Sequence, residues 1–231
     1  LLINMLITYR LQKKGYRGIF IICDKTLPVC TNERVLKTRT EDPYLCKNCY
    51  RPYDLYAKVI GAEFWKLSDF IDQKPASEKE HEIKAFNSID ECKEFKIDGV
   101  AVGLIAEKSV MRFFLTGELN DSDEHLEIYK RFLLSLAFIA NAWANIISKI
   151  DQKPSLVLLY NGTLSFETYI RKHCESDTIN YVTHETYVGQ NSCIYKKNDE
   201  VMKLKWANEW SEFKKTPLNK EQLNQAKDFL E

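Results

Sequence analysis

The sequence lacks an excess of charge of either sign, because its 231 residues contain 33 lysines and arginines and 33 aspartates and glutamates. A formal net charge of zero does not favour binding to bulk nucleic acid or to an acidic membrane surface. The chain also has no internal repeat and no low-complexity run. Its hydrophobic content of 45% is sufficient for the core of one large globular domain.

The common signatures of nucleotide, protease and hydrolase sites are also absent. The sequence contains no GxGxxG, no GxxxxGK[ST], no HExxH and no GxSxG. The first 15 residues do not fit a secretory signal peptide, because Asn4, Tyr9 and Arg10 interrupt them, and they predict an amphipathic helix. One long apolar stretch, residues 132–150, continues the helical pattern of a charged segment, so we expect a buried core helix and not a membrane span.

Helix and strand patterns alternate at both ends of the chain. A helix over residues 1–14 precedes a short apolar strand within 16–24. A helix that leads into such a strand is half of a βαβ unit, so we expect that a first strand is missing and that the chain is a fragment or a processed form. Residues 153–185 follow the order strand, helix, strand, which predicts parallel strands joined by a right-handed crossover.

The middle of the chain reads as mostly helical. We expect a helix over residues 46–61, a short strand and turn over 62–71, a solvated surface helix within 72–96, a helix that starts near 98 and ends at Gly117, and a long helix to Ile150. Two further helices are predicted over 203–215 and 217–231. The predicted fold is α/β, a single Rossmann-like domain over residues 1–231 with a parallel sheet, flanking helices and a helical middle segment.

Open α/β sheets bind ligands at the carboxyl ends of their strands. The sequence places three such ends, at Cys23-Asp24, at Tyr160-Asn161-Gly162 and at Thr183-His184-Glu185. Parallel strands would bring the last two to one rim of the sheet. These strand ends are therefore the first places to look for a site.

The residues at these ends have the chemistry of a binding or catalytic site. Asn161 and Gly162, followed by Thr163, form a tight turn into a helix, which suits a sugar hydroxyl or a phosphate oxygen and equally suits ordinary turn chemistry. His184 can exchange a proton near pH 7, and the adjacent Glu185 can set its charge or act as a base itself. A structural role for the histidine remains an alternative, and Asp24 is a candidate by its position alone.

Four of the seven cysteines, Cys23, Cys30, Cys46 and Cys49, lie within 27 residues and end in a CxxC. Only one end has the spacing of a zinc knuckle, so structural zinc, a disulfide and free thiols all remain open. An odd number of cysteines in a chain of this size favours reduced thiols in a cytoplasm. Cys46 and Cys49 begin a predicted helix, whose dipole would lower a thiol pKa.

Four stretches carry a resemblance to a known family, and they are YRLQKKGYRGIFIICDKTLPVCTNER, CKNCY, LVLLYNG and YVTHE. With them the sequence resembles the amino-terminal half of bacterial surface-polysaccharide glycosyltransferases of the GT-B architecture. These are the enzymes of the capsule, O-antigen and exopolysaccharide group. The resemblance covers residues 5–231. It implies transfer of a sugar from a nucleotide-sugar donor to a glycan or lipid-linked acceptor. Asp24, Asn161, His184 and Glu185 would face the cleft, Gly162 and Thr163 would help Asn161 to bind the acceptor, and His184 or Glu185 would be the base.

The resemblance also implies that a second α/β domain, absent from this chain, binds most of the nucleotide sugar, so we expect the chain alone to be inactive. The neutral charge and the cysteine count predict a cytoplasmic protein without a nucleic-acid partner. We also expect peripheral association of the full protein at the inner face of the membrane. Two other classes remain as alternatives. One is a non-enzymatic interaction module stabilised by zinc, and the other is a redox protein that needs a low pKa at Cys46 or Cys49.

Overall fold

The computed structural model describes residues 2–31, 33, 45–186, 192–203, 210–212 and 214–230. The α-helices are α1 (Leu2–Gln12), α3 (Leu45–Ile60), α4 (Gln73–Lys84), α5 (Ile89–Glu94), α6 (Val102–Phe114), α7 (Asp123–Lys149), α8 (Ser165–Ser176) and α10 (Lys220–Leu230). The strands are β1 (Ile19–Ile22), β2 (Glu63–Lys66), β3 (Val157–Tyr160), β4 (Tyr181–Thr186) and β5 (Cys193–Lys197), and a 3-10 helix, η1, spans Leu67–Phe70. The predicted α/β class is confirmed.

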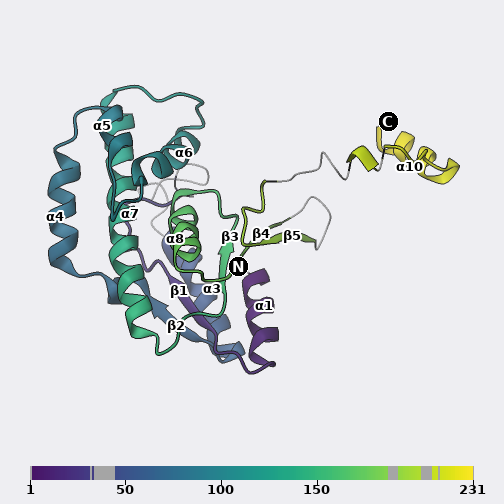
Figure 1. Cartoon of the computed structure of the whole chain (residues 1–231), viewed down its shortest axis with the longest axis horizontal. Coiled ribbons are helices and arrows are strands. Elements are labelled where there is room, and N and C mark those ends of the chain that lie inside the picture. The colour runs from purple at the N-terminus through teal and green to yellow at the C-terminus, as the bar shows by residue number, and fades with distance from the viewer. Residues whose placement is uncertain are drawn as a thin grey trace.

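The strands form two small sheets (Figure 1). β1 pairs with β2 in parallel. β3 pairs with β4 in parallel, with Tyr160 opposite His184, and β5 adds an antiparallel edge that the sequence did not predict. The predicted strand, helix, strand unit is thus confirmed, with α8 between its two parallel strands.

The sheet itself differs from the single parallel sheet that was predicted. In the described part of the chain, β1 hydrogen-bonds only to β2, and β3 hydrogen-bonds only to β4 among the strands. One edge of β1 and one edge of β3 therefore remain without a strand partner in the described residues, and the two sheets stay separate.

The long helix α7 forms the centre of the hydrophobic core. Figure 1 shows α4, α7, α8 and β3 in successive positions across the molecule, and α7 packs on both α4 and α8. Phe132, Leu133 and Leu136 of α7 are fully enclosed. By length and composition alone α7 could cross a membrane, but the core helix of a soluble protein passes the same test. Its burial agrees with the predicted core helix.

The segment 72–96 departs from its prediction as solvated surface. It forms α4 and α5, and its few apolar residues, Ile83, Ile89, Cys92 and Phe95, are buried in the core. A charged helix can contribute to a core through one narrow apolar stripe, and such a stripe is easily missed in a highly charged segment.

The helix ends show which local predictions hold. α6 ends at Phe114, and not at Gly117 as predicted, because Leu115 caps the helix in a left-handed conformation with φ 53°. α10 starts as predicted, because Asn219 Oδ1 accepts a hydrogen bond from the backbone N–H of Gln222 at 2.9 Å. The helix predicted over 203–215 lies largely outside the described residues.

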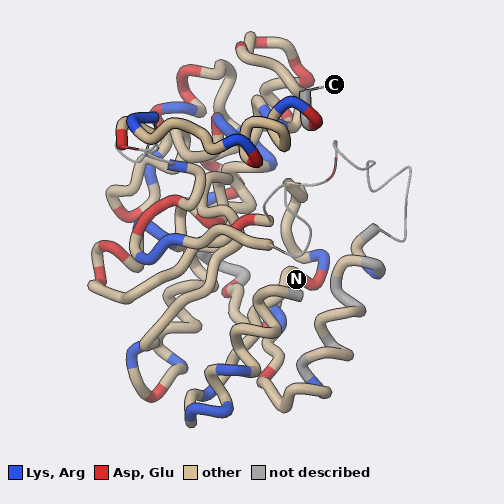
Figure 2. Tube along the Cα trace, turned by 90° about the vertical axis from the view of Figure 1, so that its right-hand side faces the viewer, with Lys and Arg blue, Asp and Glu red and all other residues tan. Residues whose placement is uncertain are grey.

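Figure 2 shows both signs of charge interspersed over the upper part of the view, in keeping with a neutral chain.

Candidate functional site at the strand ends

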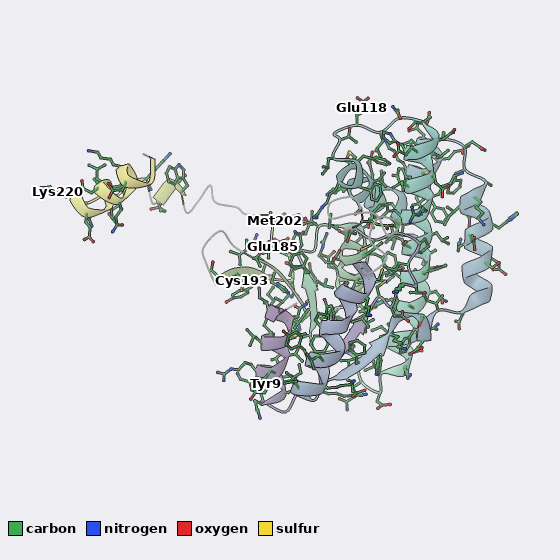
Figure 3. The ribbon with its side chains drawn as sticks, turned by 180° about the vertical axis from the view of Figure 1, so that it is seen from behind. Tyr9, Glu118, Glu185, Cys193, Met202 and Lys220 are labelled. Atoms are coloured by element: carbon green, nitrogen blue, oxygen red, sulfur yellow. The ribbon has the colours of Figure 1, made fainter. Side chains whose placement is uncertain are left out.

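The carboxyl ends of β3 and β4 form a single polar rim, which we call the β3–β4 rim and define by Tyr160, Asn161, His184 and Glu185. The backbone N–H of Asn161 donates to His184 O at 2.7 Å. Its side-chain amide donates to Glu185 Oε2 at 2.9 Å, and the Tyr160 hydroxyl donates to Glu185 Oε1 at 2.5 Å. The prediction that Asn161 and His184 lie on one rim is confirmed, and Figure 3 shows Glu185 at the end of β4.

The turn after β3 has a fixed geometry. Asn161 and Gly162 both have positive φ angles, 55° and 79°. A Cβ at Gly162 would lie 2.5 Å from Cγ2 of Thr183, so only glycine fits there. The backbone N–H of Thr163 donates to Asn161 Oδ1 at 3.1 Å, while the Thr163 hydroxyl is buried with no partner in the described part of the chain. The rim therefore presents a rigid turn that has unused hydrogen-bonding capacity at Thr163.

Glu185 is a fully engaged carboxylate. Besides the bonds from Tyr160 and Asn161, it accepts hydrogen bonds from the backbone N–H and the hydroxyl of Thr186, at 2.8 and 2.9 Å. Burial raises the pKa of Glu185, but the bonds from Tyr160, Asn161 and Thr186 outweigh burial and hold the pKa below its usual range. Such a carboxylate stays ionised and is a weak proton acceptor.

His184 is enclosed, with 1% of its surface exposed. Its Nε2 contacts Asn4 Oδ1 of α1, and because that oxygen only accepts, the ring proton lies on Nε2. Burial lowers the pKa of the imidazole, so the ring is neutral at pH 7. The other ring nitrogen, Nδ1, is buried without a partner among the described residues. His184 thus fixes α1 against the β3–β4 rim.

Asp24 lies at the end of β1 as predicted, but both oxygens of its carboxylate accept hydrogen bonds from Ser68. Oδ1 accepts from the backbone N–H of Ser68 at 3.2 Å, and Oδ2 accepts from the Ser68 hydroxyl at 2.6 Å. These bonds tie the end of β1 to η1, which follows β2. None of the hydrogen bonds of Asp24 goes to the β3–β4 rim.

Glu167, the third residue of α8, was missed by the sequence reasoning. Its Oε2 is buried and has no hydrogen-bond partner in the described residues. Burial raises its pKa to about 7, although the nearby positive charge of Arg112 opposes this rise. The available signal was an acidic residue in the first turn of a helix that directly follows a strand-end turn, a position usually explained by the helix dipole.

Tyr53 of α3 packs against the first sheet and interacts electrostatically with Glu167. Its ring packs edge-on against Phe20 of β1, with 6.5 Å between the ring centroids. Burial raises the pKa of the Tyr53 hydroxyl, and the negative charges of Cys49 and Glu167 raise it further. Tyr53 is therefore within electrostatic reach of both of these side chains.

Three of the four clustered cysteines lie near one another. Burial raises the pKa of the Cys49 thiol, and the proximity of Cys23 and Cys46 raises it further. The pKa of Cys49 is thus raised and not lowered as the helix dipole predicts, because partial desolvation and the neighbouring cysteines outweigh the dipole even though the residue is exposed. This finding counts against a redox role that depends on an activated Cys49 thiol.

The metal and disulfide interpretations of these cysteines gain no support in the described residues. Cys23, Cys30, Cys46 and Cys49 are not joined by disulfides. In this part of the chain no three His, Cys, Asp or Glu side chains are arranged to hold a metal ion. The backbone N–H of Cys30 donates to Glu33 Oε2 at 2.9 Å, and residues 34–44 of the loop lie outside the described ranges.

Comparisons with known proteins give no family for this chain. No protein-family model matches it, and neither a curated protein nor a solved structure matches it. What can be said of its function therefore rests on the geometry of the β3–β4 rim and of Glu167.

Proposed function

We propose that this chain is the acceptor-side domain of a glycosyltransferase, which transfers a sugar from a nucleotide-sugar donor to a glycan or lipid-linked acceptor. The observation that carries the proposal is the β3–β4 rim, where the turn after β3 bonds directly to the last residues of the parallel strand β4. Ligands of α/β proteins bind at this edge of the sheet. The amide of Asn161 and the unpartnered hydroxyl of Thr163 are the kinds of groups that bind sugar hydroxyls.

We also propose that the two sheets belong to one Rossmann-like sheet. A parallel strand between β1 and β3 would use the free edge of each and give the order β2-β1-strand-β3-β4. The position of α1 supports this arrangement. Its residue Asn4 contacts His184 at the rim, and Gln12 donates to Gly61 O at 3.1 Å, just before β2 begins. α1 thus extends from the rim to the opposite end of the strands.

In this proposal the nucleotide sugar is bound mainly by a second α/β domain outside these residues. The rim of the present chain then holds the acceptor hydroxyl close to the donor. We therefore expect the chain to bind a sugar with higher affinity than a free nucleotide.

Saturation-transfer NMR on the purified chain tests this selectivity. The probes are the methyl glycosides of glucose, galactose, mannose and N-acetylglucosamine, with uridine diphosphate as the nucleotide probe. We expect at least one glycoside to give a saturable signal and uridine diphosphate to give none. Asn161→Gly keeps the left-handed turn and removes the amide, and Thr163→Val removes the hydroxyl. Each should weaken glycoside binding by roughly 5- to 10-fold, the effect of one lost hydrogen bond.

Lys84→Ala, on the exposed outer part of α4, is the matched control and should bind as the wild type does. Absence of binding by all four glycosides would reject the proposal, as would equal binding by wild type and both rim variants. Tight binding of uridine diphosphate that depends on Asn161 would assign the rim to the donor instead.

A further inference from the structure

Among the three carboxylates near the strand ends, only Glu167 has an oxygen without a partner. Both oxygens of Asp24 bond to Ser68, and both oxygens of Glu185 accept hydrogen bonds. Oε2 of Glu167, in contrast, is enclosed without a donor in the described part of the chain. A buried carboxylate oxygen that lacks a donor is costly, and such costs are typically found where a ligand or a proton completes the site.

The charged groups around Glu167 come from two other elements. Arg112, near the end of α6, is exposed, and its charge acts on both Glu167 and Tyr160. Tyr53 of α3 approaches from the side of the first sheet. α8 begins directly after the turn that follows β3, so Glu167 in its first turn lies at the same end of the sheet as the β3–β4 rim.

The two residues that the sequence favoured as a base are occupied in other ways. His184 has only 1% of its surface exposed, so its Nδ1, which has no partner among the described residues, is covered, and Glu185 is held by several donors. A general base must reach the proton that it removes and must have an affinity for protons that suits neutral pH. Glu167 has an oxygen without a partner among the described residues and a side chain that is only partly buried, so it meets these conditions better than either of them.

We propose that Glu167 is the catalytic base that deprotonates the acceptor hydroxyl, an inference that rests on the proposed sugar transfer. The acceptor O–H bond breaks and its proton moves to Oε2 of Glu167. The hydroxyl oxygen forms a bond to the anomeric carbon of the donor sugar. The bond from that carbon to the phosphate oxygen of the nucleotide sugar breaks, and its electron pair leaves with the nucleoside diphosphate.

The kinetic test uses the complete enzyme that contains this chain, with a nucleotide sugar as donor. In wild type, kcat should rise with pH through about 7, as Glu167 loses its proton. Glu167→Gln should lower kcat by roughly 10²- to 10⁴-fold, the usual contribution of a general base, and should leave the acceptor KM nearly unchanged. Glu167→Asp should recover part of the rate. Glu118→Gln, in the exposed loop before α7, is the matched control and should have the wild-type rate and pH profile.

A second measurement does not depend on activity. In the chain labelled with ¹³C at the glutamate carboxyl groups, the resonance that disappears in Glu167→Gln reports the protonation of this side chain. We expect it to titrate near pH 7 and to shift when a methyl glycoside is added. If the wild-type enzyme transfers no sugar, the proposed function fails. The titration then still shows whether Glu167 has a raised pKa and responds to a glycoside.

Two results overturn the inference. One is a Glu167→Gln enzyme with the wild-type rate and pH profile. The other is a Glu167 resonance that titrates near the ordinary value of 4.5 and does not respond to any glycoside.

Discussion

Replacing Glu167 by glutamine should stabilise the protein at neutral and alkaline pH. In the unfolded chain this carboxyl ionises near its ordinary value of 4.5, whereas in the folded protein burial raises its pKa to about 7. As the pH rises from 4.5 to 7, the unfolded chain loses the proton first, so ionisation increasingly favours unfolding. The penalty is absent below about pH 4.5 and complete above about pH 7.

The size of this effect follows from the same pKa. One pKa unit corresponds to about 1.4 kcal/mol, so a rise from 4.5 to about 7 costs the folded state roughly 3 kcal/mol at pH 8. Glutamine has nearly the same shape and no charge. Glu167→Gln should therefore raise the free energy of unfolding by up to about 3 kcal/mol at pH 8 and should change it little at pH 4.5.

Urea denaturation followed by circular dichroism, repeated across this pH range, measures the effect. Glu185→Gln is the matched comparison, because the pKa of Glu185 is lowered and not raised. Its ionised form stabilises the fold above its unfolded pKa, and this contribution is lost as the pH falls through the lower folded pKa. That variant should thus be destabilised most at neutral pH. A difference between Glu167→Gln and wild type that is the same at pH 4.5 and pH 8 would refute the reasoning, as would a loss of stability at pH 8.

Other predictions concern the turn, the cysteines and Asp24. Gly162→Ala should lower the free energy of unfolding by roughly 1–3 kcal/mol more than Gly99→Ala does, as measured by urea denaturation. Both glycines have φ 79°, but of the two only Gly162 is crowded by a neighbouring side chain. Equal losses of stability would contradict this steric argument. Cys49 should react with iodoacetamide at neutral pH no faster than glutathione, with or without added zinc, because burial raises its pKa. A faster reaction, or protection by zinc, would restore the redox or the metal interpretation. Asp24→Ala and Ser68→Ala should each cost about 1 kcal/mol, and the double variant should cost less than their sum if the two residues act as one cap.

The parts of the fold that the sequence predicted well are those with strong local patterns. The sequence shows the order strand, helix, strand, which corresponds to β3, α8 and β4, and this order predicts that the two strands pair in parallel. Parallel pairing in turn places Asn161 and His184 on one rim, so the location of the candidate site was predictable from sequence. The short edge strand β5 and the separation of the two sheets were not, because they depend on pairing between distant segments.

The chemistry of the site depends on packing that no local pattern reveals. A rule that selects acidic residues at strand ends finds Asp24 and Glu185, and both carboxylates are satisfied by residues that hold them in place. Glu167 lies not at a strand end but in the first turn of α8, the helix that follows β3. Its state is set by burial, with Tyr53 and Arg112 approaching from α3 and α6. A carboxylate in the first turn of a helix is ordinarily stabilised in its charged form, so burial alone reverses the expectation from sequence. The residue best suited to proton transfer is then the one whose hydrogen bonds the fold leaves incomplete, and it is recognised only when the partners of every neighbouring carboxylate are known.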